Sequence, residues 1–176
     1  KDIFNTKTLP TQMGSPIWKN FIAGNDARVV HNLKEAGAII SGKTVTAEFA
    51  VHKLNETLNP HDLKLTPGTS SSGSAVSVAT GVCPVALGSQ TAGSIVRPAS
   101  FTGVYGFKPS YGLVPRTGML KTTDTLDSIG FFTIHKSLYV EKAIIDPSIM
   151  VDKPLSLTIS TGLDALSHSC LLYTSD

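Results

Sequence analysis

Between Lys64 and Lys108 lies a long stretch in which Arg97 is the only side chain that carries a charge at neutral pH. Small residues and hydroxyls dominate this stretch, yet β-branched and other apolar residues recur among them, as in residues 76–87. A solvated linker rich in serine and glycine would lack these apolar residues, so we expect buried backbone that presents hydroxyl groups at a site. Hydroxyls in a buried, preorganised pocket suit nucleophilic acyl transfer.

The composition predicts a globular domain with a sizeable core, since 41% of the 176 residues are hydrophobic and 16% are charged. A net charge of +2, spread along the chain, does not indicate a nucleic-acid or membrane partner. No apolar run reaches the ~18 residues that a membrane span needs, and the first residues lack the apolar core of a signal peptide. Cys83 and Cys170 have no neighbouring cysteine, which favours reduced thiols, a cytoplasmic location, no disulfide and no zinc site.

Apolar periodicity and turn residues predict an α/β fold in which at least part of the sheet is parallel. Helices are expected to start near polar capping residues and to end at glycines, as at Gly37 and Gly81. The segments that we expect are loop and short strand at 1–21, helices at 26–36, 44–54 and 73–80, a turn at 59–62, and strands at 38–40, 85–87 and 104–107.

Residues 37–44 read GAIISGKT, which matches the phosphate-binding pattern GxxxxGK[ST] at every position. A true phosphate-binding loop follows a strand and exposes its backbone amides, whereas a predicted helix comes first here. The interior residues Ala38, Ile39 and Ile40 favour a buried extended strand. We therefore interpret the match as a chance pattern around a turn and not as a nucleotide site.

Two serine-rich motifs stand out: residues 68–75 read GTSSSGSA, and residues 88–99 read GSQTAGSIVRPA. Four further segments, two before and two after these motifs, carry the same resemblance: residues 36–44, 48–50, 103–112 and 126–130. Together they resemble the amidase signature family of amide hydrolases and transamidases. This resemblance implies an α/β core with a mixed β-sheet flanked by helices, a small-molecule amide substrate and no cofactor.

The resemblance also implies a catalytic triad of two serines and a lysine. Ser94 would be the nucleophile, Ser70 a bridging serine that follows a cis peptide bond, and the lysine of a Lys-Asp pair the base, which here is Lys1. A serine hydroxyl needs a base within reach, and a lysine can serve when burial away from other charges makes it neutral. The implied path is an acyl-enzyme on Ser94, release of ammonia or an amine, and attack by water.

An oxyanion hole is expected from backbone amides next to the nucleophile, where small side chains permit close approach. These amides belong to Thr91, Ala92, Gly93 and Ser94. The departures from the family motif are that Thr69, Ser72 and Ala92 replace glycines, that Gln90 replaces an aspartate, and that Arg97 lies one position later. We interpret them as subgroup variation that leaves the three catalytic residue types in place.

Other polar residues near the motifs are expected to have supporting roles. Ser71 and Arg97 are interpreted as structural or hydrogen-bonding partners, and Asp127 as a turn or cap residue. Lys108 stays open between a surface charge and a local brace. His31, His52 and His61 lie on an expected helix face or in a turn, so no histidine is favoured as the base.

The sequence that resembles amidases ends near residue 133, and the residues that follow no longer match that family's pattern. Residues 134–169 resemble a piece of an iron-containing alcohol dehydrogenase, in which Asp164 and His168 would lie on one helix face. Two ligands do not make a metal site, so both are weak candidates and helix capping or solvation is favoured. Residues 170–176 resemble translated sequencing-adapter text. We interpret the chain as a chimera of a truncated amidase core at 1–133, a foreign segment and an artefactual tail.

Three hypotheses about function follow. The first is an amidase that hydrolyses a carboxamide or transfers its ammonia, with transfer RNA as a partner only in an amidotransferase-like case. The second is an inactive fragment, because the chain starts on Lys1 and its α-amino group would sit on the residue that must be a neutral base. The third is a metal-dependent alcohol dehydrogenase fragment, which rests on the C-terminal segment alone. No membrane partner is expected, and the sequence does not specify the amide or the oligomeric state.

Overall fold

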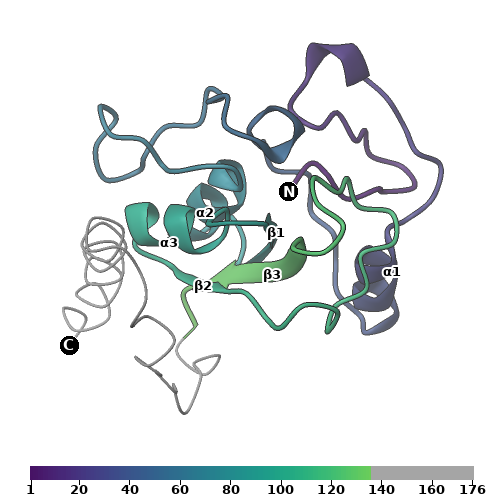
Figure 1. The fold of residues 1–176 in the computed structure, drawn as a ribbon. Coiled ribbons are helices and arrows are strands. Elements are labelled where there is room, and N and C mark those ends of the chain that lie inside the picture. Colours follow the sequence, from purple (N-terminus) through teal and green to yellow (C-terminus); the bar gives the residue numbers. More distant parts are fainter. Residues whose placement is uncertain (136–176) are drawn as a thin grey trace, which may run out of the picture. The chain divides into compact units, whose positions relative to one another are not determined.

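The computed structural model describes residues 1–135, which form one compact unit (Figure 1). The predictions for residues 136–176, among them Asp164, His168 and the tail, lie outside the described residues. The helices are α1 (Arg28–Glu35), α2 (Ser72–Ala79) and α3 (Val96–Thr102), with short 3₁₀ turns η1 (Pro16–Trp18) and η2 (Glu48–Ala50). The strands are β1 (Val85–Gln90), β2 (Tyr105–Phe107) and β3 (Ser128–Thr133).

The three strands form one sheet in the order β1-β3-β2, and both neighbouring pairs are antiparallel. Gly88 of β1 lies opposite Gly130 of β3, and Phe107 of β2 lies opposite Phe131 of β3. The α/β class is confirmed, but the expected parallel pairing is wrong for the part of the chain that the structure describes. β1 and β2, joined through α3, run in the same direction, yet β3 lies between them and pairs with both.

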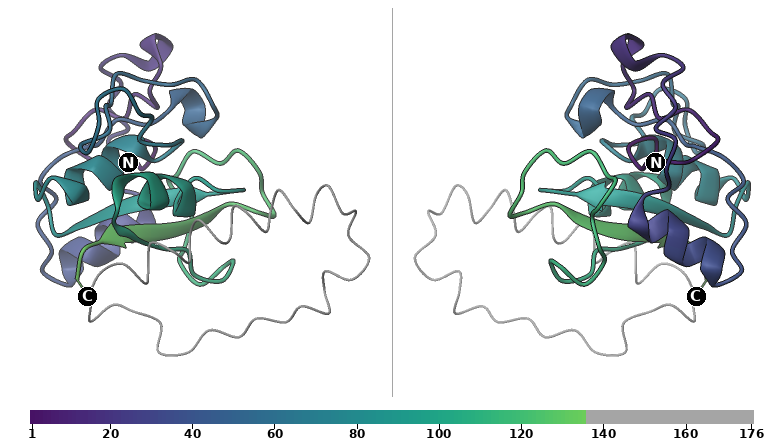
Figure 2. Two further views of the ribbon diagram at one scale, coloured as in Figure 1. Left: turned by 90° about the vertical axis from the view of Figure 1, so that its left-hand side faces the viewer. Right: turned by 90° about the vertical axis from the view of Figure 1, so that its right-hand side faces the viewer.

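Helices cover both faces of this sheet (Figure 2). α2 and α3 lie on the face where Phe132 is buried together with Val78 and Ile95. α1 lies on the opposite face, where Val29 packs with Ile129. Side chains that are an odd number of positions apart on a strand point to opposite faces, as Ile129 and Phe132 do. The sheet therefore separates two apolar clusters.

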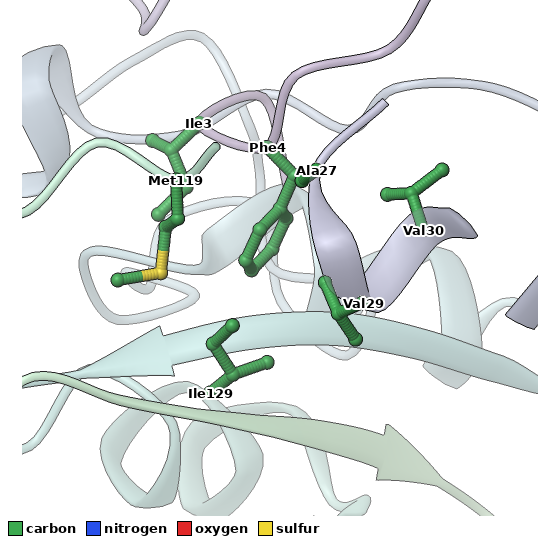
Figure 3. Packing of buried hydrophobic residues seen from close by; sticks show 7 residues of the cluster. All are labelled: Ile3, Phe4, Ala27, Val29, Val30, Met119 and Ile129. Carbon is green, nitrogen blue, oxygen red and sulfur yellow. The ribbon is translucent and has the colours of Figure 1, made fainter. Parts of the chain in front are cut away.

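The first residues of the chain are fixed in the cluster that faces α1. Figure 3 shows the ring of Phe4 pointing toward Val29 and Ile129, with Ile3 close by. Ile3 and Phe4 are 0% and 2% exposed, and full burial of such a side chain contributes about 1.5–3 kcal/mol. A main-chain hydrogen bond from Leu120 N to Ile3 O (2.9 Å) holds the same segment. The start of the chain is thus held by both packing and main-chain pairing.

Two of the predicted helices are present with changes at their ends. α2 begins at Ser72, and Gly81 follows its end with a φ of +73°, in agreement with the predicted stop. α1 begins at Arg28, later than expected, because the Asp26 carboxylate pairs with Lys34 Nζ (2.8 Å) and does not cap the helix. Among the described residues no helix combines the length and the apolar character that crossing a membrane requires.

The strand predicted at residues 38–40 is absent. Ile39 is 91% exposed, and Ala38 N donates a hydrogen bond to Leu33 O (2.9 Å) as the chain turns away from the end of α1. Ile40 alone packs, partly buried, against the cluster that faces α1. The prediction is wrong because β-branched residues favour a strand only where a neighbouring strand can pair with them.

The helix predicted at residues 44–54 is also wrong, since the segment forms only η2. Its main-chain groups are paired with distant residues: Ala47 N donates to Ser70 O (3.0 Å), and Gly73 N donates to Val45 O (3.1 Å). A helix would need the same groups for its own ladder. The apolar spacing of this segment therefore reflects contacts of an extended chain with the serine-rich loop.

Candidate active site

The side chain of Lys1 is buried between two serine hydroxyls. Its Nζ lies 2.7 Å from Ser70 Oγ and 2.8 Å from Ser89 Oγ, and the Ser89 carbonyl oxygen lies at 3.5 Å. Lys1 is 6% exposed and Ser70 is 1% exposed, so water has little access to these groups. The structure therefore places Lys1 against Ser70, a residue 69 positions away in the sequence.

Burial lowers the pKa of the Lys1 ammonium from its ordinary 10.5 to about 7, and the negative charge of Asp127 offsets only part of this effect. A lysine with this pKa is neutral in a large fraction of molecules at pH 7. The neutral amine has a lone pair and can take a proton from a hydroxyl, which an ordinary charged lysine cannot do. The environment of Lys1 thus favours the neutral form of its amine.

Ser70 is fixed immediately before α2. The Thr69–Ser70 peptide bond is cis. The carbonyl oxygen of Ser70 accepts hydrogen bonds from Ala47 N (3.0 Å) and from Thr46 Oγ1 (3.1 Å). These bonds hold the main chain of Ser70, so its hydroxyl has a defined position beside the Lys1 amine.

Ser94 and the expected oxyanion residues lie in the loop between β1 and α3. Ser94 is half-buried at the end of this loop, Thr91 and Gly93 are half-buried, and Ala92 is exposed. Within the described residues, Ser94 Oγ makes no hydrogen bond, and no group accepts one from the backbone N–H of residues 91–94. The structure brings Lys1 and Ser70 into contact but does not place Ser94 in hydrogen-bond contact with either.

Gln90 and Arg97 hold this loop. Gln90 Oε1 accepts hydrogen bonds from Ile95 N (2.8 Å) and Val96 N (2.9 Å), which closes the loop around residues 91–94. Arg97 N donates to Gly93 O (2.9 Å), and a methyl group added at Gly93 would lie 3.1 Å from Arg97 Nη2. A side chain at position 93 would therefore require the guanidinium of Arg97 to shift by a few tenths of an ångström.

Asp127 connects the same loop to the segment before β3. Its carboxylate accepts hydrogen bonds from Thr122 N (2.6 Å), from Thr123 N (3.0 Å) and from the hydroxyls of Thr122 and Thr91. Burial raises the pKa of the Asp127 carboxyl, but the bonds from Thr91, Thr123 and Thr122 outweigh burial and lower it. The prediction of a turn residue is confirmed, and the structure adds the bond to Thr91.

A second lysine, Lys43, is partly buried near the segment that carries Lys1. Its Nζ forms an ion pair with Asp2 Oδ1 (3.0 Å) and donates to Thr11 Oγ1 (2.9 Å) and to Pro10 O (3.1 Å). Because Asp2 follows Lys1 directly, this ion pair fixes the main chain next to the buried amine.

Sequence reasoning missed Ser89, and it gave Asp127 no part in the site. The strand was expected to end at residue 87, whereas β1 continues to Gln90 and carries Ser89 into the sheet beside Lys1. Ser71 reaches the same place, since its hydroxyl donates to Ser89 O (3.3 Å). A longer strand in the sequence prediction would have placed Ser89 within the sheet.

The structure thus places a buried lysine of lowered pKa between two serine hydroxyls in an α/β scaffold. The family model described as Amidase matches residues 1–145. The chain belongs to the amidase family.

The curated relatives include A subunits of glutamyl-tRNA(Gln) amidotransferases. The chain is 49% identical over 138 residues to the subunit from Psychrobacter sp.. The aligned region covers 75% of this chain and 28% of the relative. The subunit from Rippkaea orientalis is 49% identical over 138 residues, with 75% of this chain and 29% of the relative covered. The chain therefore spans less than a third of the length of these relatives.

Solved structures agree with this assignment. The A subunit of glutamyl-tRNA(Gln) amidotransferase from Thermotoga maritima superposes with a TM-score of 0.73 at 43% identity, over 76% of this chain and 31% of that chain. The native peptide amidase from Stenotrophomonas maltophilia gives a TM-score of 0.72 at 31% identity, over 86% of this chain and 37% of that chain. Both similarities cover most of the described residues.

Proposed function

We propose that this chain carries the serine–lysine centre of an amidase that cleaves the C–N bond of a small-molecule carboxamide. The observation that carries the proposal is the buried pair of Lys1 Nζ and Ser70 Oγ, 2.7 Å apart, with the pKa of Lys1 lowered to about 7. This pair supplies what a serine nucleophile needs, which is a hydroxyl relay backed by a neutral base. Ser94, on the adjoining loop, is the proposed nucleophile.

In the proposed reaction each proton has a defined path. The Lys1 lone pair takes the proton of Ser70 Oγ, and Ser70 Oγ takes the proton of Ser94 Oγ as the latter bonds to the amide carbon. When the C–N bond breaks, the leaving nitrogen receives a proton through Ser70 from Lys1, and an acyl ester remains on Ser94. Water then repeats the sequence, releases the carboxylic acid and restores the Ser94 hydroxyl. This path requires Ser94 Oγ to come within hydrogen-bond reach of Ser70 Oγ.

The loop before α3 suits stabilisation of the negative oxygen that forms in this reaction. The N–H groups of residues 91–94 donate to no other described residue, and the loop is held by Gln90 and Asp127. Preorganised backbone N–H groups aimed at a developing oxyanion are among the strongest catalytic devices, and loss of one donor costs roughly 100-fold to 1,000-fold in rate. We assign the oxyanion hole to Thr91, Ala92, Gly93 and Ser94 on this ground.

A second candidate is transfer of the released ammonia in place of its loss to water. The 49% identity to A subunits of glutamyl-tRNA(Gln) amidotransferases favours it, and it would make a charged transfer RNA a partner of the complete assembly. The two candidates share the acyl-enzyme and differ in the acceptor of the nitrogen. Both depend on Lys1 and Ser70 in the same way.

The proposal is tested with a fluorophosphonate probe, whose phosphorus bonds to an activated serine oxygen while fluoride leaves. We expect an adduct on Ser94 in the parent chain, located by mass spectrometry, and none in Ser94→Ala. In Lys1→Met the labelling rate should fall by roughly 100-fold to 10,000-fold, the usual contribution of a general base. Lys108→Met is the matched control, because Lys108 is exposed and, among the described residues, its Nζ donates a hydrogen bond to the carbonyl of Pro109.

Two results would overturn the proposal. One is a folded parent chain, verified by circular dichroism, that gives no adduct on Ser94 at any pH between 6 and 10. The other is an adduct that forms equally fast in Lys1→Met and in the parent.

A further inference from the structure

The Lys1 amine contacts two oxygen atoms of one residue, Ser89. Ser89 Oγ lies at 2.8 Å, inside the normal range for an N–H donor, and the carbonyl oxygen of the same residue makes a longer contact at 3.5 Å. Ser70 Oγ, at 2.7 Å, is the third neighbour. A lysine amine thus has three oxygen neighbours, of which Ser89 supplies two.

A count of donors and acceptors shows what Ser89 does for a neutral amine. Such an amine has two N–H bonds and one lone pair, and it can take the Ser70 proton only if the lone pair faces Ser70 Oγ. Both N–H bonds must then point elsewhere. The Ser89 carbonyl can only accept, and Ser89 Oγ can accept the second bond. With both N–H bonds directed at Ser89, the lone pair is left facing Ser70.

The same arrangement suits the charged amine. When the Ser70 proton moves to Nζ, the lone pair becomes a third N–H bond, and all three bonds then point at Ser70 Oγ, Ser89 Oγ and Ser89 O. No side chain has to turn between the two protonation states. Proton transfer between positioned groups is fast when the surrounding dipoles need no reorganisation.

Ser89 is itself held rigidly. It is 7% exposed, lies in β1 and pairs with Ile129 of β3. The hydroxyl of Ser71 donates to its carbonyl oxygen (3.3 Å), which fixes the acceptor that faces Lys1. β1 continues directly into the loop that carries Ser94, so Ser89 lies on the segment between the Lys1 contact and that loop.

We propose that Ser89 is a positioning residue that turns the lone pair of the Lys1 amine toward Ser70. The proposal rests on the proposed serine–lysine function, since it gives the orientation of the base in that reaction. Ser89 neither bonds to the substrate nor exchanges a proton. Among the described charged groups near the Lys1 amine, Asp127 acts on it through its negative charge, and Asp2 on the neighbouring main chain is paired with Lys43. The α-amino group of Lys1 donates to Leu87 O (3.2 Å), and burial lowers its pKa to about 4.

The test compares Ser89→Ala with the parent by two readouts. The first is the pKa of Lys1, from the ¹³Cε signal that disappears in Lys1→Met. Loss of an acceptor for the ammonium disfavours the charged form, so this pKa should fall. The second is the rate of fluorophosphonate labelling, which should fall by about tenfold, the effect of one lost hydrogen bond to a charged group. Ser89→Thr keeps a hydroxyl and should restore both values.

Matched controls separate this role from general stability. Thr102→Val removes another fully buried hydroxyl, which donates to Pro98 O (2.7 Å) in α3 and shares no acceptor with Lys1 among the described residues. It should leave the Lys1 pKa unchanged. If Ser89→Ala does not fold, Ser89→Cys keeps the volume with a much weaker acceptor and should shift both readouts in the same direction.

The proposal is overturned if the Lys1 pKa in the folded Ser89 variants equals that of the parent, or if Ser89→Thr behaves like Ser89→Ala. Failure of the proposed function would look different. In that case the parent itself gives no adduct on Ser94, while the comparison of Lys1 pKa values still decides the contact with Ser89.

Discussion

Lys1 is buried and Lys43 is partly buried, and their amines differ in the charge of the groups that they contact. The Nζ of Lys43 lies 3.0 Å from a carboxylate oxygen of Asp2, whereas in the described part of the chain the hydrogen bonds of Lys1 Nζ go to hydroxyl and carbonyl oxygens of Ser70 and Ser89. Burial lowers the pKa of both amines, but the hydrogen bond and charge of Asp2 act against this at Lys43. At Lys1 burial prevails, and the pKa falls to about 7.

The difference shows how one residue type serves two purposes a short distance apart in the fold. A carboxylate partner keeps a buried lysine charged and makes it a brace for the main chain. Neutral oxygen partners leave the charged form less well stabilised, so the pKa of the amine falls. The stretch with a single charged residue between Lys64 and Lys108 contributes Ser70 and Ser89, and thus uncharged contacts, to the surroundings of Lys1.

The largest expected effect concerns the stability contributed by Lys1. In the unfolded chain its pKa returns to 10.5, while in the folded chain it is about 7, so between these values the unfolded state binds more protons and stability rises with pH. The gain from pH 7 to pH 10.5 should be about 3–5 kcal/mol, and Lys1→Met should lack it. Urea unfolding of both chains across this range measures it. Equal slopes in the two chains would contradict a neutral buried amine.

The second effect concerns Lys43. Lys43→Met leaves the Asp2 carboxylate largely buried without a counter-charge, which should reduce the free energy of unfolding by about 3 kcal/mol. Urea unfolding at pH 7 measures the loss. Lys34→Met, which breaks the more exposed pair with Asp26, should cost less than about 1 kcal/mol. A similar loss of unfolding free energy in Lys43→Met and Lys34→Met would contradict a larger contribution from the buried pair with Asp2.

The smallest effect concerns Asp127, the negative charge that acts on Lys1. Asp127→Asn removes this charge, so the pKa of Lys1 should fall below about 7 and labelling should extend to lower pH. A ¹³Cε titration of Lys1 measures the change. Asp124→Asn is the control, because Asp124 is exposed and pairs with Lys121 (2.7 Å). A rise of the Lys1 pKa in Asp127→Asn would contradict a direct effect of the Asp127 charge on the Lys1 amine.

The sequence alone was informative where short motifs of small residues occur. Helix α2 and its stop at Gly81 were predicted from the run of small residues that ends at a glycine. Strands β1 and β2 were predicted from short runs of apolar and aromatic residues, although β1 was expected to end at residue 87. The family resemblance then pointed to Lys1 and Ser70, which lie side by side in the structure.

The rest depended on contacts that a local pattern does not contain. Residues 44–54 have helical spacing, but their main-chain groups pair with Ser70 and its neighbours, and this long-range pairing overrides the local preference. The pattern of strand, helix and strand correctly predicted that β1 and β2 run in the same direction. It did not predict that β3 lies between them and pairs with both. The part of Ser89 in the site was missed because it depends on the last residues of β1.

The span of the Lys1 contacts has a consequence for the kinetics of folding. The amine meets Ser70 and Ser89 across 69 and 88 positions of sequence. Contacts of this separation close large loops, which costs chain entropy and slows their formation relative to local structure. The Lys1 amine can acquire its lowered pKa only once the N-terminal segment has docked on β1. Under the proposed function, fluorophosphonate reactivity after dilution from denaturant should therefore appear no earlier than this docking step.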